Sequence, residues 1–262
     1  MKKKILYSLI VSIILIIFIF LNSKSSRYTG VNYMVIENKI SNFQKINELF
    51  ERDRKYKELV REIKSNEKNK HNEIIKISRW VYKNIKKINY DISDDIIDSH
   101  PWTIVKRRMG VEDQFSDILS VLFFYGGIDS FFMNDLNVEG HPITLFKLND
   151  DWSLIDPYYG IYFLNDKGEF CNLKEYKFKE CIFYHLEFGK LSEKLLVKIF
   201  FNKNFTNLEE LNNYYYVQFK NIPSSKKINK TSIYERGGRS YVQKPIHRLI
   251  YQIKKSLNII KK

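Results

Sequence analysis

Residues 140–160 read GHPITLFKLNDDWSLIDPYYG, and two apolar runs lie within them, at 142–148 and 152–156. Asparagine and aspartate separate the runs, and these residue types favour turns. Two short apolar runs bounded by turn residues are typical of paired antiparallel strands. This stretch therefore predicts a β-hairpin, in its tightest form with Asn149 and Asp150 as the turn.

The register of this hairpin decides which side chains share a face of the sheet. A two-residue turn places Ile143 opposite Asp156 and His141 opposite Tyr158. His141 and Asp156 then become diagonal neighbours, with backbones about 7–8 Å apart and side chains that can meet. A different turn would separate them, so this expectation depends on the register.

A helix is expected directly before the sheet. The segment MGVEDQFSDIL at 109–119 contains a break at Gly110. After this break, apolar residues recur at the spacing of one buried helix face: Phe115, Ile118, Leu119 and Leu122. Gly126 and Gly127 follow, and we expect them to end the helix near Tyr125.

The rest of the body supplies further helices and strands. Residues 34–65 are charged with scattered apolar positions, which predicts one or two surface helices. A clearer helix face is formed by Ile74, Ile77, Val81, Ile85 and Ile88. Additional strands are expected at the short apolar runs 128–133, 160–164, 195–201 and 214–219. Helices that precede a strand meander predict an α+β fold.

The N-terminus predicts a membrane anchor. Residues 1–4 contain three lysines, and ILYSLIVSIILIIFIFL at 5–21 carries no charge. As a helix this run spans about 26 Å, close to the thickness of a bilayer core. A cleaved signal peptide is the alternative, but Leu21-Asn22-Ser23 is a poor cleavage site. The lysines predict a cytoplasmic N-terminus and an extracytoplasmic domain, as in a single-pass protein of a bacterial cell membrane.

Basic residues are concentrated at the two ends of the chain. The 44 Lys and Arg residues against 30 acidic residues give a formal charge of +14. Most of this excess lies in residues 226–262 and in Lys2 to Lys4, so the body is nearly neutral. This distribution suits contact with a membrane surface better than a nucleic-acid-binding face, and we expect no nucleic-acid partner.

Composition also suggests the domain boundaries. We expect a linker at 22–33, which is rich in Ser and Asn, a domain at 34–220 and a basic tail at 221–262. Within the tail, 244–262 has the pattern of an amphipathic helix, with an apolar stripe formed by Ile246, Leu249, Ile250, Ile253, Leu257 and Ile260. Such a helix either lies on a membrane surface or docks to a partner, or it packs on the flank of its own domain.

The two cysteines, Cys171 and Cys181, are ten residues apart. We expect two independent buried thiols, although an oxidising compartment would allow a disulfide across a hairpin. Neither cysteine belongs to a metal-binding motif, and CxxC, HExxH, Walker A and GxGxxG patterns are absent from the sequence. The sequence therefore predicts no metal and no cofactor.

Five features of the body occur in a fixed order: Gly110, Gly127-Ile128, His141, Trp152 and Asp156-Pro157. Together with an upstream helix that carries Trp80, this order and spacing resemble the core of the transglutaminase-like branch of the papain-type thiol enzymes. The resemblance covers about residues 71–165. It implies a papain-like core, with N-terminal helices and a central helix packed on an antiparallel sheet, behind the transmembrane helix.

The resemblance implies a triad of Glu112, His141 and Asp156, in which Glu112 replaces the nucleophilic cysteine of the family. In the family, the helix dipole and an imidazolium that the aspartate orients stabilise a thiolate at the helix N-terminus. Glutamate keeps the charge, but a carboxylate is a weak nucleophile towards an amide. Neither Cys171 nor Cys181 precedes the histidine as the family order requires, so we expect thiol catalysis to be lost.

Three interpretations of these positions remain open. In the first, Glu112, His141 and Asp156 form a buried ion-paired cluster that holds the helix to the hairpin. In the second, the old cleft still binds a peptide, a glycan or an envelope protein without cutting it. In the third, the chain is an active hydrolase or transferase with Glu112 and His141 as general base and acid. That mechanism needs a carboxyl whose pKa is raised by its surroundings, whereas a helix start and a histidine both lower the pKa.

Further candidate ligand contacts around this cleft are Trp102, Asp113, Gln114 and Trp152. Trp102 lies shortly before the helix, whereas Asp113 and Gln114 follow Glu112 directly. For Trp152, packing within the hairpin is the alternative role.

Overall fold

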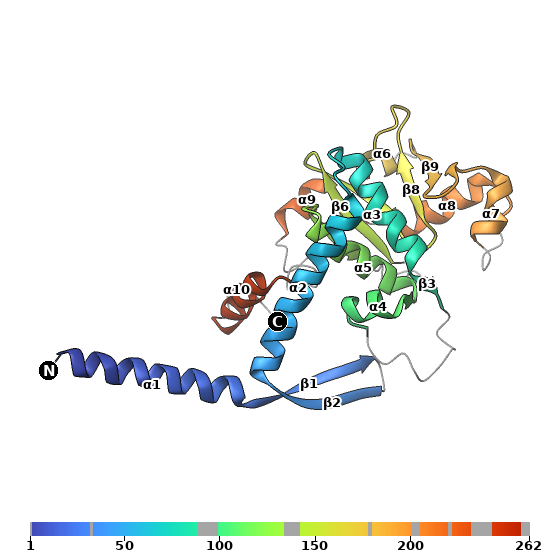
Figure 1. Ribbon diagram of the computed structural model, residues 1–262. Helices are drawn as coiled ribbons and strands as arrows, with labels where there is room; N and C mark the ends of the chain where they lie inside the picture. The colour runs from blue at the N-terminus through green and yellow to red at the C-terminus, as the bar shows by residue number, and fades with distance from the viewer. Residues whose placement is uncertain are drawn as a thin grey trace.

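The computed structural model describes residues 2–31, 34–88, 99–133, 142–177, 180–200, 205–219, 222–231 and 243–257 (Figure 1). The first helix, α1 (Lys2–Asn22), extends away from the body of the molecule, and its apolar span is not buried. Within the described residues, α1 is the one helix that is long and apolar enough to cross a membrane. By length and composition alone, the same helix also suits a signal sequence.

The linker expected at 22–33 is wrong, because most of it belongs to a β-hairpin. β1 (Lys24–Val31) pairs antiparallel with β2 (Met34–Ser41). The Ser25 hydroxyl donates a hydrogen bond of 2.6 Å to Asn42 Oδ1 at the base of this hairpin. Polar residues such as Ser25 thus form hydrogen bonds within a folded hairpin. Composition predicted a linker wrongly because a polar hairpin and a linker contain the same residue types.

Helices pack together behind the main sheet: α2 (Asn42–Lys64), α3 (Lys70–Asn84) and α5 (Glu112–Tyr125). The Ser41 hydroxyl accepts from the Gln44 N–H over 3.1 Å, so the surface helix predicted at 34–65 begins only after this cap. The helix predicted around 110–125 is confirmed as α5. The helix face predicted from Ile74 to Ile88 is confirmed only as far as α3 extends, because the helix ends at Asn84 and Lys86–Lys87 form a strand.

Shorter elements connect these helices. They are β3 (Lys86–Lys87), α4 (Pro101–Arg107) and β4 (Met109–Gly110), and β3 pairs in parallel with β4. This parallel pair brings the end of α3 beside the start of α5.

The main sheet has six antiparallel strands in the order β10-β9-β8-β7-β6-β5. Their bounds are β5 (Ser130–Met133), β6 (Ile143–Leu148), β7 (Asp151–Asp156), β8 (Ile161–Leu164), β9 (Ile182–His185) and β10 (Gly189–Lys190). α5 packs on β5 and β6, where the Phe123 and Phe146 rings meet edge-on with centroids 5.5 Å apart. Helices packed on an antiparallel sheet confirm the predicted α+β class.

The hairpin predicted at 140–160 is confirmed as β6 and β7. Thr144 lies opposite Ile155, which is the register of a two-residue turn. The turn residues Asn149 and Asp150 have φ angles of 49° and 69°, the left-handed conformation that such a turn needs and that these residue types tolerate.

The two later strands were predicted wrongly. Residues 195–201 fall mostly in α7 (Glu193–Ile199), and 214–219 fall in α8 (Leu208–Phe219). In α8, Leu211 and Tyr215 are fully buried four residues apart, which is helix spacing. In the main sheet, β9 and β10 were not predicted. Two short helices complete the body, α6 (Leu173–Lys177) and α9 (Ser225–Lys230).

The basic tail forms α10 (Pro245–Ser256), within the amphipathic helix predicted at 244–262. α10 contacts α2, and Lys244 lies over the Phe124 ring at 4.5 Å from its centroid. Four aliphatic side chains of α10 and the Leu257 side chain that follows it are exposed among the described residues: Ile246, Leu249, Ile250, Ile253 and Leu257. The helix therefore contacts the domain through one side and presents an exposed apolar stripe.

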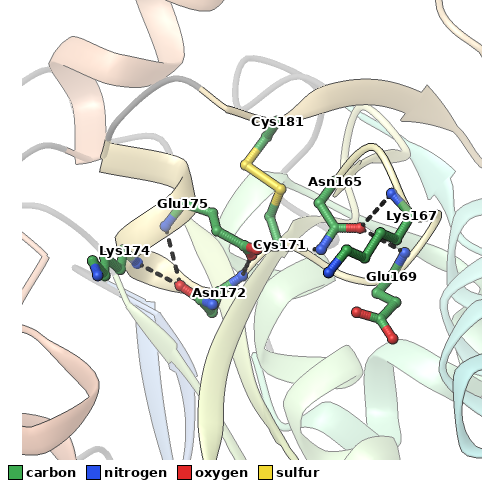
Figure 2. Close-up of a disulfide and its surroundings, with 8 residues drawn as sticks. All are labelled: Asn165, Lys167, Glu169, Cys171, Asn172, Lys174, Glu175 and Cys181. Atoms are coloured by element: carbon green, nitrogen blue, oxygen red, sulfur yellow. Dashed lines mark hydrogen bonds between the residues drawn. A yellow bond between two sulfur atoms is a disulfide. The ribbon is translucent and has the colours of Figure 1, made fainter.

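Cys171 and Cys181 form a disulfide with Cα atoms 6.1 Å apart, so the expectation of two independent thiols is wrong (Figure 2). The bond ties the segment before α6 to the segment before β9. Between them, Asn172 Oδ1 accepts from the Glu175 N–H over 3.1 Å, and Glu175 Oε2 accepts from the Asn172 N–H over 2.8 Å. This local capping turns the chain so that the two sulfur atoms meet.

Reduction of this disulfide is expected to lower the free energy of unfolding by about 2–3 kcal/mol, because the bond closes a short loop in the unfolded chain. The measurement is urea unfolding of the full chain in non-ionic detergent, followed by tryptophan fluorescence. The control is the Cys171→Ser/Cys181→Ser variant, which should start at the reduced value and not respond to reductant. An unchanged unfolding midpoint after reduction would contradict the prediction.

Candidate functional site

The site is built around Glu112, the first residue of α5, which the β3–β4 pair holds in place. The Lys86 N–H donates to the Arg108 carbonyl over 2.8 Å, and the Ile88 N–H donates to the Gly110 carbonyl over 3.1 Å. A Cβ added to Gly110 would lie 3.2 Å from Gln114 Oε1, tighter than ordinary contact. Gly110, two residues before Glu112, therefore allows β4 to run close to the first turn of α5.

Gln114, a candidate ligand contact, caps the helix in the structure. Its Oε1 accepts from the Val111 N–H over 3.3 Å and from Arg107 Nη2 over 2.7 Å. The side chain is 7% exposed. Gln114 thus caps the start of α5, and this structural role uses its amide oxygen.

Asp156, at the end of β7, is fully buried. Its Oδ1 accepts from the N–H groups of Tyr158 and Tyr159, both over 3.0 Å. Its Oδ2 accepts from the Tyr215 hydroxyl of α8 over 2.5 Å. Asp156 therefore shapes the turn from β7 to β8 and connects this turn to α8. Several donors compensate the burial of its charge.

Lys87 on β3 lies next to both predicted carboxylates. Its Nζ is 4.8 Å from the centroid of the Tyr158 ring and 5.2 Å from that of Tyr82. Burial lowers the pKa of the Lys87 ammonium, whereas the charges of Asp156 and Glu112 act in the opposite direction. The structure thus places a half-buried cation and an aromatic cluster where the sequence predicted acidic and imidazole groups alone.

The Tyr158 phenol is subject to the same two charges. Burial raises its pKa, and the negative charges of Glu112 and Asp156 raise it further. Because both carboxylates act on Lys87 and on Tyr158, Glu112 and Asp156 lie in one locality of the structure. The Phe115 ring meets the Tyr158 ring edge-on at 5.2 Å and packs α5 against this turn.

His141 lies outside the described residues, so its place in the triad stays a prediction. The residue after it is anchored to α5, because the Ser116 hydroxyl donates to the Pro142 carbonyl over 2.9 Å. The Thr144 hydroxyl in turn donates to the Ser116 carbonyl over 3.1 Å. The start of β6 is therefore tied to α5 one turn after Glu112.

The remaining candidate contacts are dispersed. Trp152 is fully buried, and its Nε1 donates to Asn229 Oδ1 over 2.8 Å, so its indole packs in the core. Trp102 packs edge-on against Tyr56 with centroids 4.9 Å apart, on the α2 side of the molecule. Asp113 is half-buried beside Glu112.

A shallow basin of about 960 Å³ adjoins the site, and Lys87 and Tyr82 form part of its wall. The other cationic side chains that line it are Lys83, Lys86, Arg107 and Arg108. Sequence reasoning missed this basic basin because lysines and arginines at a helix end usually point into solvent, and only the β3–β4 pairing collects them on one side.

His185 on β9 is a second buried group that the sequence did not single out. Its Nδ1 accepts from the Glu187 N–H over 3.1 Å, and its ring meets Tyr82 edge-on at 5.1 Å. Burial lowers the pKa of His185 to about 4, and the positive charge of Lys87 contributes. The imidazole is therefore neutral at physiological pH and supports Tyr82.

This pKa predicts a pH dependence of stability. The unfolded histidine titrates near 6.5, so between pH 6.5 and about 4 the unfolded chain binds the proton more tightly than the folded chain. The free energy of unfolding should therefore fall by up to about 3 kcal/mol as the pH decreases through this window. Urea unfolding at pH 7 and pH 4 measures the loss. His185→Asn, whose Oδ1 can replace Nδ1 as acceptor, should lose less stability over the same interval, and an equal loss would contradict the assignment.

Comparison with known proteins gave structural neighbours only. No family model and no curated protein matches the chain. Among solved structures, a "Putative Cysteine Protease from Cytophaga hutchinsonii" is 17% identical, with a TM-score of 0.34 over 40% of this chain and 37% of the other. A "putative protease from Parabacteroides distasonis" is 9% identical, with a TM-score of 0.32 over 66% of this chain and 40% of the other.

The chain thus spans about two fifths of the length of these two proteins. Both TM-scores are below 0.5, so the α+β assignment rests on the element order and sheet described above.

Proposed function

We propose that this chain is a membrane-anchored transglutaminase-like domain that lacks thiol catalysis and binds a peptide, a glycan or an envelope protein. One observation carries the proposal: the two cysteines of the chain are joined in a disulfide, while a glutamate occupies the helix start where the resemblance expects the nucleophile. A disulfide sulfur is not a thiolate, so the chemistry of the family has no nucleophile here.

The contacts of Asp156 give this residue a structural role that a binding site also needs. Here both oxygens of Asp156 hold backbone N–H groups and the Tyr215 hydroxyl. A carboxylate used in this way stabilises the fold around the cleft whether or not a reaction takes place.

The α1 helix and the disulfide support an extracytoplasmic location. Disulfides persist in oxidising compartments and are rare in the cytosol. The lysines before α1 favour a cytoplasmic N-terminus, which places the domain on the opposite side of the membrane. We therefore propose a single-pass protein whose domain faces the cell envelope.

The basin beside Lys87 supports the choice of ligand. Its wall is mainly cationic, with Lys86, Lys87 and Arg108 among the lining residues, and Lys83 pairs with Glu187 over 3.1 Å. Such a wall favours ligands with carboxylate or carbonyl groups, which peptides and acidic glycans carry.

The site is tested by introducing a thiol. In the full chain, Glu112→Cys should react with iodoacetamide at a pH at least about one unit lower than Asp113→Cys does, because Lys87 and the predicted His141 add to the helix dipole only at position 112. The native cysteines are bonded and do not compete. Coinciding pH profiles for the two thiols would contradict the equivalence of Glu112 to the family nucleophile.

The loss of catalysis is tested on the wild-type chain. We expect no turnover of peptide, ester or glycan substrates. Turnover that disappears in Glu112→Gln would overturn the proposal and support the alternative of an active hydrolase or transferase that uses Glu112, His141 and Asp156 without a thiol.

A further inference from the structure

A second concave surface lies where β1, α2, α4 and α10 meet, away from the Lys87 basin. It encloses about 500 Å³, and the cations that line it are Arg27, Arg52, Lys55, Lys106 and Arg248. These residues come from four elements that are far apart in the sequence. None of them belongs to the site described above, although the candidate residue Trp102 forms part of the wall.

Only part of this positive charge is neutralised within the pocket. Glu48 pairs with Arg27, and Glu51 pairs with Lys55 over 2.5 Å. Within the described residues, Arg52, Lys106 and Arg248 form no ion pair. After internal pairing, the pocket therefore keeps a net charge of about three positive units.

Arg52 gives the strongest indication of an anion site in this pocket. Its Nε is buried and has no hydrogen-bond partner among the described residues. Burial lowers the pKa of its guanidinium, and the positive charges of Arg248 and Arg27 lower it further. A shielded donor beside like charges is unfavourable, and an anion would satisfy the donor and offset the repulsion.

We propose that this pocket binds a phosphate group through Arg52, Lys106 and Arg248. A guanidinium presents two parallel N–H donors that match a phosphate, and a tetrahedral dianion balances several cations better than a single carboxylate does. The volume leaves room for the organic remainder of a phosphate ester, with the Trp102 indole as an apolar wall.

The same chemistry is available from a soluble phosphate ester or from a phospholipid headgroup. The position of α10 makes the second source relevant. In Figure 1, α10 lies beside α2, on the side toward which α1 extends, and its exposed aliphatic residues include Leu249 and Ile253. Arg248 of this helix lines the pocket, so the phosphate site adjoins the side of the domain from which the anchor emerges.

The test uses the full chain in maltoside micelles and follows the fluorescence of Trp102 and the other tryptophans. One arm titrates inorganic phosphate and glycerol phosphate. The other titrates phosphatidic acid, a phosphate monoester, with diacylglycerol as the matched lipid that lacks the phosphate. We expect saturable binding of at least one phosphate compound and none of diacylglycerol. Saturation in the first arm identifies a soluble phosphate as the ligand, and saturation by phosphatidic acid alone identifies a lipid headgroup.

Variants decide whether the binding is at this pocket. Arg52→Gln should weaken binding at least fivefold, and Lys106→Gln, at an exposed position where folding is not at risk, should weaken it similarly. The matched control is Arg54→Gln, because Arg54 is 61% exposed on the same helix and pairs with Glu58 instead. No saturable binding, or equal binding by Lys106→Gln and Arg54→Gln, would overturn the proposal.

Discussion

Replacing Asp156 by alanine is expected to lower the free energy of unfolding by about 3–5 kcal/mol, the range for a buried charge whose partners are left unsatisfied. The change removes the acceptor of the Tyr158 and Tyr159 N–H groups and of the Tyr215 hydroxyl, all within the protein. Lys87 would also lose one of the two carboxylates that favour its charge. Urea unfolding of the full chain in detergent measures the loss.

Two further variants separate the parts of this effect. Asp151→Ala, at the exposed start of the same strand, should change stability by less than about 0.5 kcal/mol. Tyr215→Phe removes one hydrogen bond and should cost about 1–2 kcal/mol. If Asp156→Ala were no more destabilising than Asp151→Ala, Asp156 would not hold the β7–β8 turn to α8.

The hairpin could be predicted in detail because its determinants are local. Asn149 and Asp150 tolerate the left-handed conformation, and the strands on either side have six residues each. Once the turn is set, the register follows from the pleat of the strands. The same local logic predicted α5, whose apolar face and terminal glycines are both visible in the sequence.

The errors fall where local patterns are ambiguous. The run at 195–201 is apolar and short, which suits a strand or one turn of a buried helix equally well, and in α7 only Leu196 and Ile199 are buried. The β1–β2 hairpin has polar strands outside the core, so its sequence lacks the apolar alternation that identifies a strand.

The site was predicted only in part, because its other members come from distant elements. Asp156 and Glu112 could be selected by their place in a motif, but Tyr215 reaches Asp156 from α8, and no spacing rule connects them. Lys87 is brought in by the two-residue pairing of β3 with β4. Such contacts depend on tertiary packing, which a single sequence does not specify residue by residue.

These additional members change the interpretation of the carboxylate cluster. A Glu–His–Asp arrangement alone suggests proton transfer, whereas Lys87 among tyrosine rings adds a fixed cation beside both acids. A cation in this position can pair with a carboxylate of a ligand as well as with those of the protein, which agrees with a binding site.

The second large effect is expected at Gly160, the residue that lets the β7–β8 turn pass beside Tyr82. Its φ is +71°, and an added Cβ would lie 2.9 Å from two Tyr82 ring carbons and 3.1 Å from His185 Nε2. Gly160→Ala should therefore combine backbone strain with overpacking and lower the free energy of unfolding by about 3 kcal/mol. Because Tyr82 also faces Lys87, the displaced ring should disturb the cluster as well.

Gly168→Ala is the matched control for this effect. Gly168 has a φ of +77°, but no atom lies within 4 Å of the Cβ that alanine would add. Gly168→Ala should therefore lower the free energy of unfolding through backbone strain alone, by about 1 kcal/mol. The difference between the two variants measures the close approach of the turn to Tyr82 and His185. Equal losses for the two alanine variants would mean that the Tyr82 ring moves aside at no cost in free energy. The aromatic cluster beside Lys87 would then not be rigid.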